Sequence, residues 1–302
     1  MSTVVARPAE LIELKNILYP TDFSQPSEAA LPFAAALARR YGATIRALHV
    51  LDASPFAYIT PEMTGMALEA ERELAFTSVR QLEAQLADLP HEILLERAPT
   101  VWEGVSRVIS DGSIDLIILG THGRTGAQRF LLGSVAEEIF RRSPHPVLTV
   151  GPAVRSSSHN GGHFHRILFA TDYGPGSSAA APYAVSLAQH SAARLLLVHV
   201  AEVAEPGDGD RDREVSVAEM IHKLYDTVPS QAELSIPPEV LIEYGKPGER
   251  IIETAHHRSV DLIVLGVRSA RGHLGAATHL ERATAHEIVA HAPCPVLTVR
   301  EA

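Results

Sequence analysis

The stretch DLIILGTHGRTGAQRFLLGSVAEEI, residues 115–139, decides the fold class. Its first part is a continuous apolar run, which indicates a strand buried on both faces, as in parallel sheets covered by helices. A loop of glycines, arginines and a histidine follows, and a helical pattern begins at Ser134. This loop is too polar and too rich in glycine to serve as packing material. We therefore expect an α/β fold with a ligand bound at the loop.

The chain contains two copies of one unit. KNILYPTDFSQPSEAALPFAAALARRYGATIRALHVLD, from Lys15, reappears as HRILFATDYGPGSSAAAPYAVSLAQHSAARLLLVHVAE, from His165. We expect one domain over residues 1–152 and a second over residues 164–302. The stretch between them, residues 153–163, has serine, glycine and histidine without an apolar period, which is typical of a flexible linker.

Strands and helices alternate within each copy. In the first copy the apolar period changes from strand-like to helical and back, in the order expected of βαβ units. Apolar runs predict five strands, at residues 17–19, 45–51, 92–96, 115–119 and 146–150. The expected fold is therefore two tandem doubly wound domains, each with a five-stranded parallel sheet.

Composition limits the possible functions. The chain has 302 residues, 46% of them hydrophobic, which suits two ordinary domains. A formal net charge of -10 argues against general binding of nucleic acid or membrane surfaces, since both need clustered positive charge. No apolar run reaches the roughly 18 residues of a membrane span. The single cysteine, Cys294, cannot form an internal disulfide. These features favour a cytoplasmic protein.

Two strands of the first copy end in unusual residues. One ends at Pro20–Asp22 and the other at Gly120–Gly123. Ligands of open parallel sheets bind beyond the carboxyl ends of the strands, where the strand order reverses. Gly133 and Ser134 stand at the start of the following helix, whose free N–H groups and dipole favour a phosphate. With Arg124 adding positive charge, the loop is predicted to clamp phosphates.

The spacing of Gly120, Gly123, Gly133 and Ser134, together with a strand ending in PTD, resembles the ATP-binding class of the universal stress protein family. The resemblance covers nearly the whole chain as two tandem copies. It implies a sheet of order 3-2-1-4-5, as in adenine nucleotide alpha hydrolase-like folds. It also implies ATP binding, a stress-response or signalling role, and pairing of units through their last strands.

The resemblance also implies which residues contact the nucleotide. The adenine and ribose end would contact Pro20, Thr21, Asp22 and the backbone of Val50. The ribose and phosphates would contact Gly120, His122, Gly123, Arg124, Gly133, Ser134 and Val135. Magnesium is expected to accompany ATP mostly through water and phosphate oxygens. No catalytic residue and no protein ligand to a metal is expected.

The second copy departs from this pattern. It keeps Gly266, but Ser269 replaces the second glycine, and the loop is three residues longer. Arg282 and Ala283 stand where the glycine and serine should begin the helix, and the bulk of an arginine would block a phosphate there. We expect the second copy not to bind ATP. The alternative is a different anion site formed by Arg268, Arg271 and Arg282.

Two classes of function remain. The favoured class is a binding or signalling module whose nucleotide changes the surface shown to an unknown protein partner. The alternative is a slow ATPase or nucleotide hydrolase, for which His122 and Asp22 are the evident candidate bases. We also expect the copies to pair within the chain through residues 146–150 and 295–299, and a homodimer is left open.

Three further patterns favour other functions only weakly. GPGSSA, from Gly174, imitates a dinucleotide fingerprint, but the first copy has no glycine there. The acidic stretch from Asp208 imitates a calcium loop, but Arg213 occupies the position that requires glycine. Most of the 16 histidines lie in the second copy, without the spacing of a metal site. His49 and His199 are predicted to be structural.

Overall fold

The computed structural model describes residues 12–52, 61–112, 114–121, 132–154, 162–201, 210–267 and 276–301. The chain divides into two compact units, one of Glu13–Pro152 and one containing Ala153–Ala302, which we call the first copy and the second copy. Most of the expected linker lies outside the described residues. The pairing of the two copies through their last strands stays a prediction.

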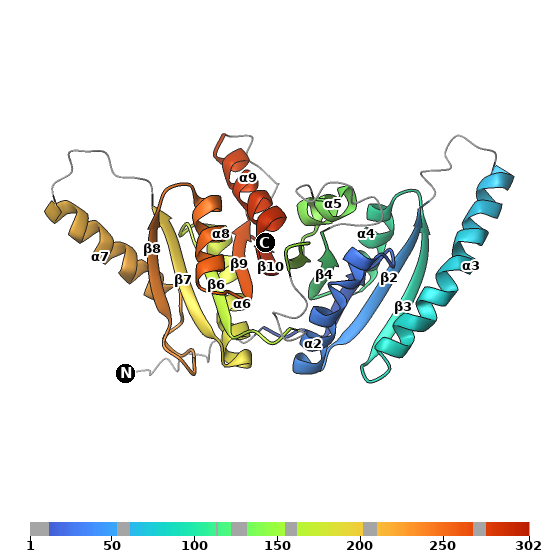
Figure 1. Cartoon of the computed structure of the whole chain (residues 1–302), viewed down its shortest axis with the longest axis horizontal. Coiled ribbons are helices and arrows are strands. Elements are labelled where there is room, and N and C mark those ends of the chain that lie inside the picture. The colour runs from blue at the N-terminus through green and yellow to red at the C-terminus, as the bar shows by residue number, and fades with distance from the viewer. Residues whose placement is uncertain are drawn as a thin grey trace, which may run out of the picture. The chain divides into compact units, whose positions relative to one another are not determined.

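The first copy is a parallel five-stranded sheet with helices packed on it (Figure 1). Its strand order is β3-β2-β1-β4-β5. The strands are β1 (Asn16–Pro20), β2 (Thr44–Asp52), β3 (His91–Ala98), β4 (Leu116–Gly120) and β5 (Val147–Val150). The helices are α1 (Gln25–Glu28), α2 (Leu31–Tyr41), α3 (Pro61–Gln85), α4 (Val101–Asp111) and α5 (Ser134–Arg142).

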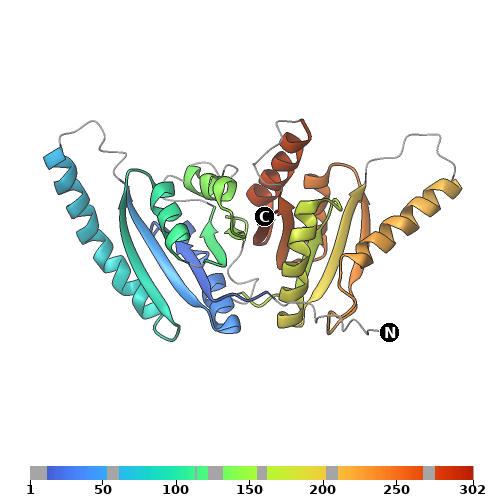
Figure 2. The ribbon, with the colours of Figure 1, turned by 180° about the vertical axis from the view of Figure 1, so that it is seen from behind.

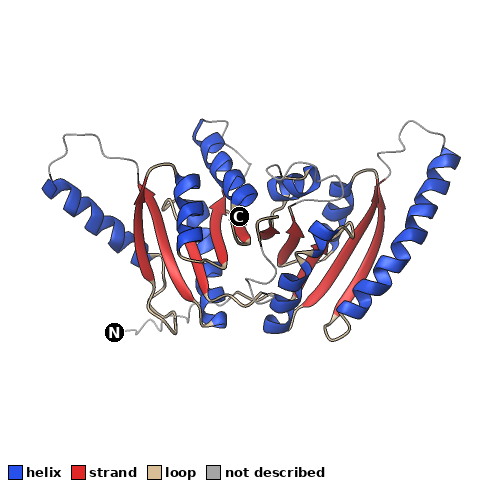
Figure 3. Cartoon of the chain, in the orientation of Figure 1, coloured by secondary structure: helices blue, strands red, loops and turns tan. Residues whose placement is uncertain are grey.

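The second copy repeats this architecture (Figure 2). Its parallel strands lie in the order β8-β7-β6-β9-β10, which is again 3-2-1-4-5. The strands are β6 (Arg166–Ala170), β7 (Arg194–Ala201), β8 (Glu239–Tyr244), β9 (Leu262–Val267) and β10 (Val296–Arg300). The helices are α6 (Pro175–Ser191), α7 (Asp210–Asp226), α8 (Pro247–His257) and α9 (Ala276–His291). The alternation of helix and strand, visible in Figure 3, confirms the predicted fold class.

The core of each copy lies along its central strands. Ile17, Leu18, Ile117 and Ile118 are completely inaccessible to solvent, as expected of strands covered by helices on both faces. In the described segments, no helix is both long enough and apolar enough to cross a membrane.

The helical segment after the first strand is interrupted in the first copy and continuous in the second, although both contain a proline at the same position. In the first copy the helix is interrupted before Pro32, which lies in the first turn of α2, where its missing N–H costs nothing. In the second copy α6 continues through Pro182. The sequence predicted one helix in the first copy, and the short separate helix α1 was not expected.

A carboxylate fixes the start of the central strand in each copy. Oδ2 of Asp115 accepts hydrogen bonds from the N–H groups of Lys15 and Asn16, at 2.7 and 2.8 Å. Oδ2 of Asp261 accepts the equivalent bonds from His165 and Arg166, at 2.7 and 2.9 Å. The matching bonds show that Asn16 and Arg166 occupy the same position in the two copies.

Candidate functional site

The carboxyl ends of β1 and β4 in the first copy lie close together. Gly120, the last residue of β4, packs against Pro26 in α1, because a Cβ built on Gly120 would lie 2.4 Å from the Pro26 carbonyl oxygen. The N–H of Gly133 donates to the carbonyl of Thr121 at 2.8 Å, which fixes the start of α5 at the end of β4. The structure therefore brings together the segments after β1 and β4 and the start of α5, as the sequence predicted.

Close packing requires a glycine near the end of the fourth strand in both copies. The equivalent Gly266 is even closer to a neighbouring backbone, since its Cβ would lie 2.1 Å from the carbonyl carbon of Gly176. A side chain at either position would push the helix after the first strand away from the sheet. The second copy keeps this glycine although it has lost the rest of the motif, which is expected if this glycine serves packing.

Asp22 shapes the turn that follows β1. Its Oδ1 accepts hydrogen bonds from the N–H of Ser24 at 3.0 Å and from the Ser24 hydroxyl at 2.5 Å. The hydroxyl of Thr21 lies 2.7 Å from that of Ser27 and is buried with it. Sequence reasoning missed Ser24 and Ser27. The signal was present, because a serine before a proline in the first turn is typical of a helix N-terminus.

His49 supports the same turn from β2. Its Nδ1 lies 2.8 Å from the carbonyl oxygen of Thr21, so Nδ1 carries the proton and donates it. The ring of Phe23 lies against the imidazole, with 4.7 Å between the ring centroids. His199 makes the equivalent bond to the carbonyl of Thr171 at 2.8 Å. Both histidines hold a turn, in agreement with the structural role predicted for them.

The start of α5 presents free N–H groups. The first bond within the helix joins the N–H of Glu137 to the carbonyl of Gly133, at 2.8 Å. The N–H groups of Ser134, Val135 and Ala136 come before it and have no partner within the helix. Among the described residues no side chain caps this end, and both Ser134 and Val135 are exposed. The helix dipole adds about half a positive charge here, so the position favours an anion.

The remaining predicted contacts fall into two groups. Pro20 is buried at the end of β1, and Val50 is buried against α4, where a Cβ on Gly104 would lie 2.7 Å from Val50 Cγ2. The side chain of Val50 therefore faces the core, which leaves its backbone for the contact predicted. His122, Gly123 and Arg124 lie outside the described residues.

The second copy lacks this helix start. Counting from the shared PVLTV, Ser134 corresponds to Ala283, and α9 already includes Ala276, seven residues earlier. The N–H groups of residues 283–285 are therefore inside the helix, where each bonds the carbonyl four residues before it. The sequence aligned Arg282 and Ala283 with Gly133 and Ser134, and the structure places both inside α9 rather than at its start. Extension of the helix removes the free N–H groups, whatever the side chain of Arg282 does.

A small apolar cavity nevertheless remains at the strand ends of the second copy. Its volume is about 140 Å³, and its lining includes Val198, Ile251, Leu265 and Ile288. Asp172 borders it, and Oδ1 of this residue accepts hydrogen bonds from the N–H of Gly174 at 2.8 Å and the hydroxyl of Ser177 at 2.6 Å. The strand ends of the second copy therefore form a cavity, but no helix starts beside it at the position of Ser134.

Comparison with known proteins assigns the family. The model of the universal stress protein family matches residues 13–151 and again residues 163–300. The chain belongs to this family. A universal stress protein of Methanocaldococcus jannaschii is 33% identical over 140 residues, which cover 45% of this chain and 81% of that protein. One from Synechocystis sp. is 25% identical over 316 residues, covering 95% of this chain and 100% of its own length.

Solved structures agree with the tandem arrangement. A universal stress protein from Archaeoglobus fulgidus aligns with 96% of this chain and 100% of its own, with a TM-score of 0.71 and 20% sequence identity. At this identity the likeness supports the fold alone. In this universal stress protein the start of the helix after the fourth strand differs between the copies, at Ser134 in α5 and no later than Ala276 in α9.

Proposed function

We propose that the first copy of this universal stress protein binds ATP and that the second does not. The observation that carries this proposal is the contrast between α5 and α9. Helix α5 starts at Ser134, beside the ends of β1 and β4, with N–H groups that have no partner within the helix and no capping side chain among the described residues. Helix α9 extends past the same position, so an equivalent phosphate would meet no free N–H group.

In this proposal each part of the nucleotide has its own contacts. The adenine and ribose lie over Pro20, Thr21, Asp22 and the backbone of Val50. The phosphates lie at Gly133, Ser134 and Val135, with Gly120 holding the neighbouring backbone in place. His122, Gly123 and Arg124 complete the clamp. Magnesium joins the phosphates through their own oxygens and water, since no protein ligand is assigned to it.

The proposed role is a nucleotide-dependent module in a stress response. The loop of residues 122–131 connects two fixed points, because its ends are joined by the hydrogen bond between Gly133 and Thr121. A nucleotide held between these points alters the surface beside it, which an unknown protein partner could recognise. ATP therefore acts as a signal, and its hydrolysis is not required.

The slow ATPase is the competing proposal, and a kinetic experiment separates the two. Oδ1 of Asp22 is occupied by Ser24, which makes this carboxylate a poor general base. His122 is the other candidate. Single-turnover hydrolysis of ATP should be negligible in wild type and unchanged in His122→Ala. Hydrolysis that His122→Ala abolishes would instead favour the enzyme.

A matched pair of variants tests the binding site itself. Ser134→Glu places a negative charge at the start of α5, where it suits the helix dipole but repels a phosphate. Ala283→Glu makes the same change at the equivalent position of α9. Calorimetry with magnesium and ATP should show that binding is lost in Ser134→Glu and kept in Ala283→Glu. Equal binding by both variants would rule out the proposed site.

A further inference from the structure

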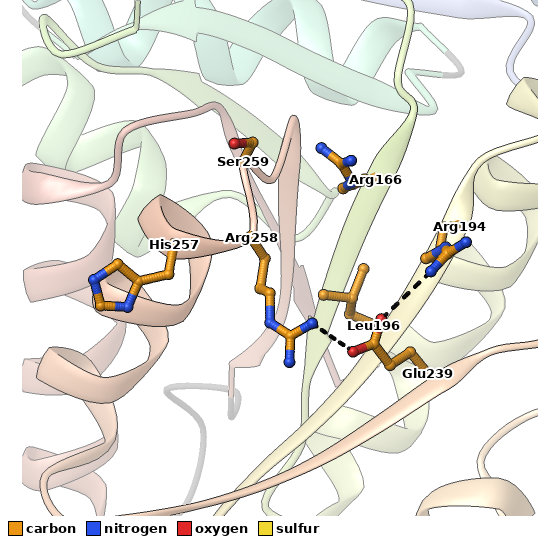
Figure 4. A pocket seen from close by; sticks show the side chains of 7 residues that line it. All are labelled: Arg166, Arg194, Leu196, Glu239, His257, Arg258 and Ser259. Carbon is orange, nitrogen blue, oxygen red and sulfur yellow. Dashed lines mark hydrogen bonds and ion pairs between the residues drawn. The ribbon is translucent and has the colours of Figure 1, made fainter.

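Three arginines lie around one cavity at the amino-terminal ends of the second copy's strands. Arg166 and Arg194 are the first residues of β6 and β7, and Arg258 follows the last residue of α8. They line a cavity of about 240 Å³, together with Glu239, the first residue of β8 (Figure 4). We call it the arginine cavity. Because the strands are parallel, it lies at their amino ends, away from the crevice at their carboxyl ends.

The arginine cavity has an excess of positive charge. Glu239 pairs with Nη1 of Arg258 at 2.7 Å and with Nη1 of Arg194 at 3.7 Å, as the dashed lines in Figure 4 show. The side chain of Arg166 forms no ion pair or hydrogen bond with any described residue. Arginine stays charged at all relevant pH values, so three arginines and one glutamate leave two positive charges in the lining, of which the nearby Asp261 carboxylate, bound to the N–H of Arg166, offsets one. The end of α8 offsets about half a charge.

The first copy shows that the fold does not need these arginines. The hydrogen bonds of Asp115 and Asp261 make Asn16 the counterpart of Arg166. Thr44 is the counterpart of Arg194, because their N–H groups donate to the carbonyls of Lys15 and His165. Asparagine and threonine therefore suffice at these strand starts. A purely structural role does not explain why both positions became arginine.

Glu239 of the cavity also has a counterpart in the first copy. Glu92 is the first copy's counterpart of Glu239, since β3 pairs it with Arg46 and β8 pairs Glu239 with Leu196. In the first copy one arginine neutralises the carboxylate, with Arg46 Nε 2.9 Å from Glu92. In the second copy Leu196 replaces that arginine, two others, Arg194 and Arg258, pair with the carboxylate, and Arg166 lines the same cavity without pairing with it. One arginine is enough for the ion pair, so Arg166 and the more loosely paired Arg194, at 3.7 Å, can turn to a ligand.

We propose that the arginine cavity binds the phosphate group of a small molecule. Guanidinium groups match phosphate oxygens in pairs, and the remaining positive charge attracts an anion. The volume is below the roughly 300 Å³ at which pockets for drug-sized ligands begin, which limits the ligand to a compact one. The site goes beyond the proposed ATP site and does not depend on it, since the two belong to different copies.

The test uses the full chain carrying Ser134→Glu, so that phosphate cannot bind at α5. Calorimetry is performed with inorganic phosphate, with a simple alkyl phosphate and with acetate as a singly charged comparison. Saturable binding of at least one phosphate compound, and weaker binding of acetate, is expected. Preference for the ester or for the free ion identifies the source of the phosphate group. No saturable binding of either would overturn the proposal.

Variants then place the binding in the cavity. Arg166→Asn combined with Arg194→Thr introduces the residues that the first copy uses, so folding should be kept, and affinity should fall at least about tenfold, or about 1.4 kcal/mol. Glu239→Gln should raise affinity, because it removes the competing carboxylate, whereas a structural ion-pair cluster would only lose stability. Arg39→Gln is the control, because it removes an arginine of the first copy that forms an ion pair with Asp88, and it should leave phosphate affinity unchanged. Unchanged affinity in the double variant would overturn the assignment.

Discussion

Gly120→Ala and Gly266→Ala should each destabilise the protein without any ligand present. Real Cβ atoms stay at least 3.0 Å from such neighbours, so the backbone must move by 3.0 − 2.4 = 0.6 Å at Gly120 and by 3.0 − 2.1 = 0.9 Å at Gly266. Overpacking of this kind costs about 1–3 kcal/mol. Alanine also restricts the unfolded chain more than glycine does, which stabilises the folded state by about 0.4–1 kcal/mol. The expected net loss is about 1–2 kcal/mol, larger for Gly266→Ala.

Thermal unfolding followed by circular dichroism measures this loss. For a chain of this size it corresponds to a decrease in Tm of roughly 2–8 °C in the affected copy. Gly65→Ala is the control, because Gly65 lies in α3 with no atom within 4 Å of the added Cβ. That change should raise stability by about 0.5–1 kcal/mol. Unchanged stability in Gly120→Ala would refute the packing explanation, and contact with a ligand would then be the better explanation for this glycine.

Three further predictions concern single groups. Burial raises the pKa of the Cys294 thiol, so iodoacetamide should modify Cys294 quickly only after unfolding; rapid reaction in native buffer would contradict its burial. Burial raises the pKa of Tyr173 to about 12, above its unfolded value of 10.0, so its stabilising effect should be complete below pH 10 and disappear between pH 10 and 12. Denaturant titrations should show a steeper loss in wild type than in Tyr173→Phe, which keeps the contribution of Tyr19, whose pKa burial also raises. Asp115→Ala should cost about 2–3 kcal/mol in the same assay, because two N–H groups lose a charged acceptor, and a loss below 0.5 kcal/mol would argue against that role.

The fold could be predicted because its signals are local and occur twice. Apolar runs such as DLIIL are buried on both faces, and the repeat gave each strand a second, independent example. The break between α1 and α2 could not be predicted in the same way. Pro32 and Pro182 occupy matching positions, yet only the first copy has a break there, so the proline alone does not determine whether the helix is interrupted.

The site could be predicted in part. The spacing from Gly120 to Ser134 correctly located the start of α5 at the ends of β1 and β4. The reason assigned to Gly120 was incomplete, because a sequence does not show that Pro26 lies against it. The start of α9 could not be located from the sequence for a similar reason. HLERATAHE has good helix formers throughout, and only the position of the first copy's glycine suggested a boundary there. The arginine cavity has no sequence signature, since its residues come from four separate elements.

The number of ATP molecules bound per chain tests the central claim most directly. Calorimetry of the full chain with ATP and magnesium should give a stoichiometry near one, because only α5 offers free N–H groups at the crevice. Ala283→Glu should leave that value unchanged. A stoichiometry near two, reduced to one by Ala283→Glu, would contradict the account, since it would show that the extended helix α9 still accepts a phosphate.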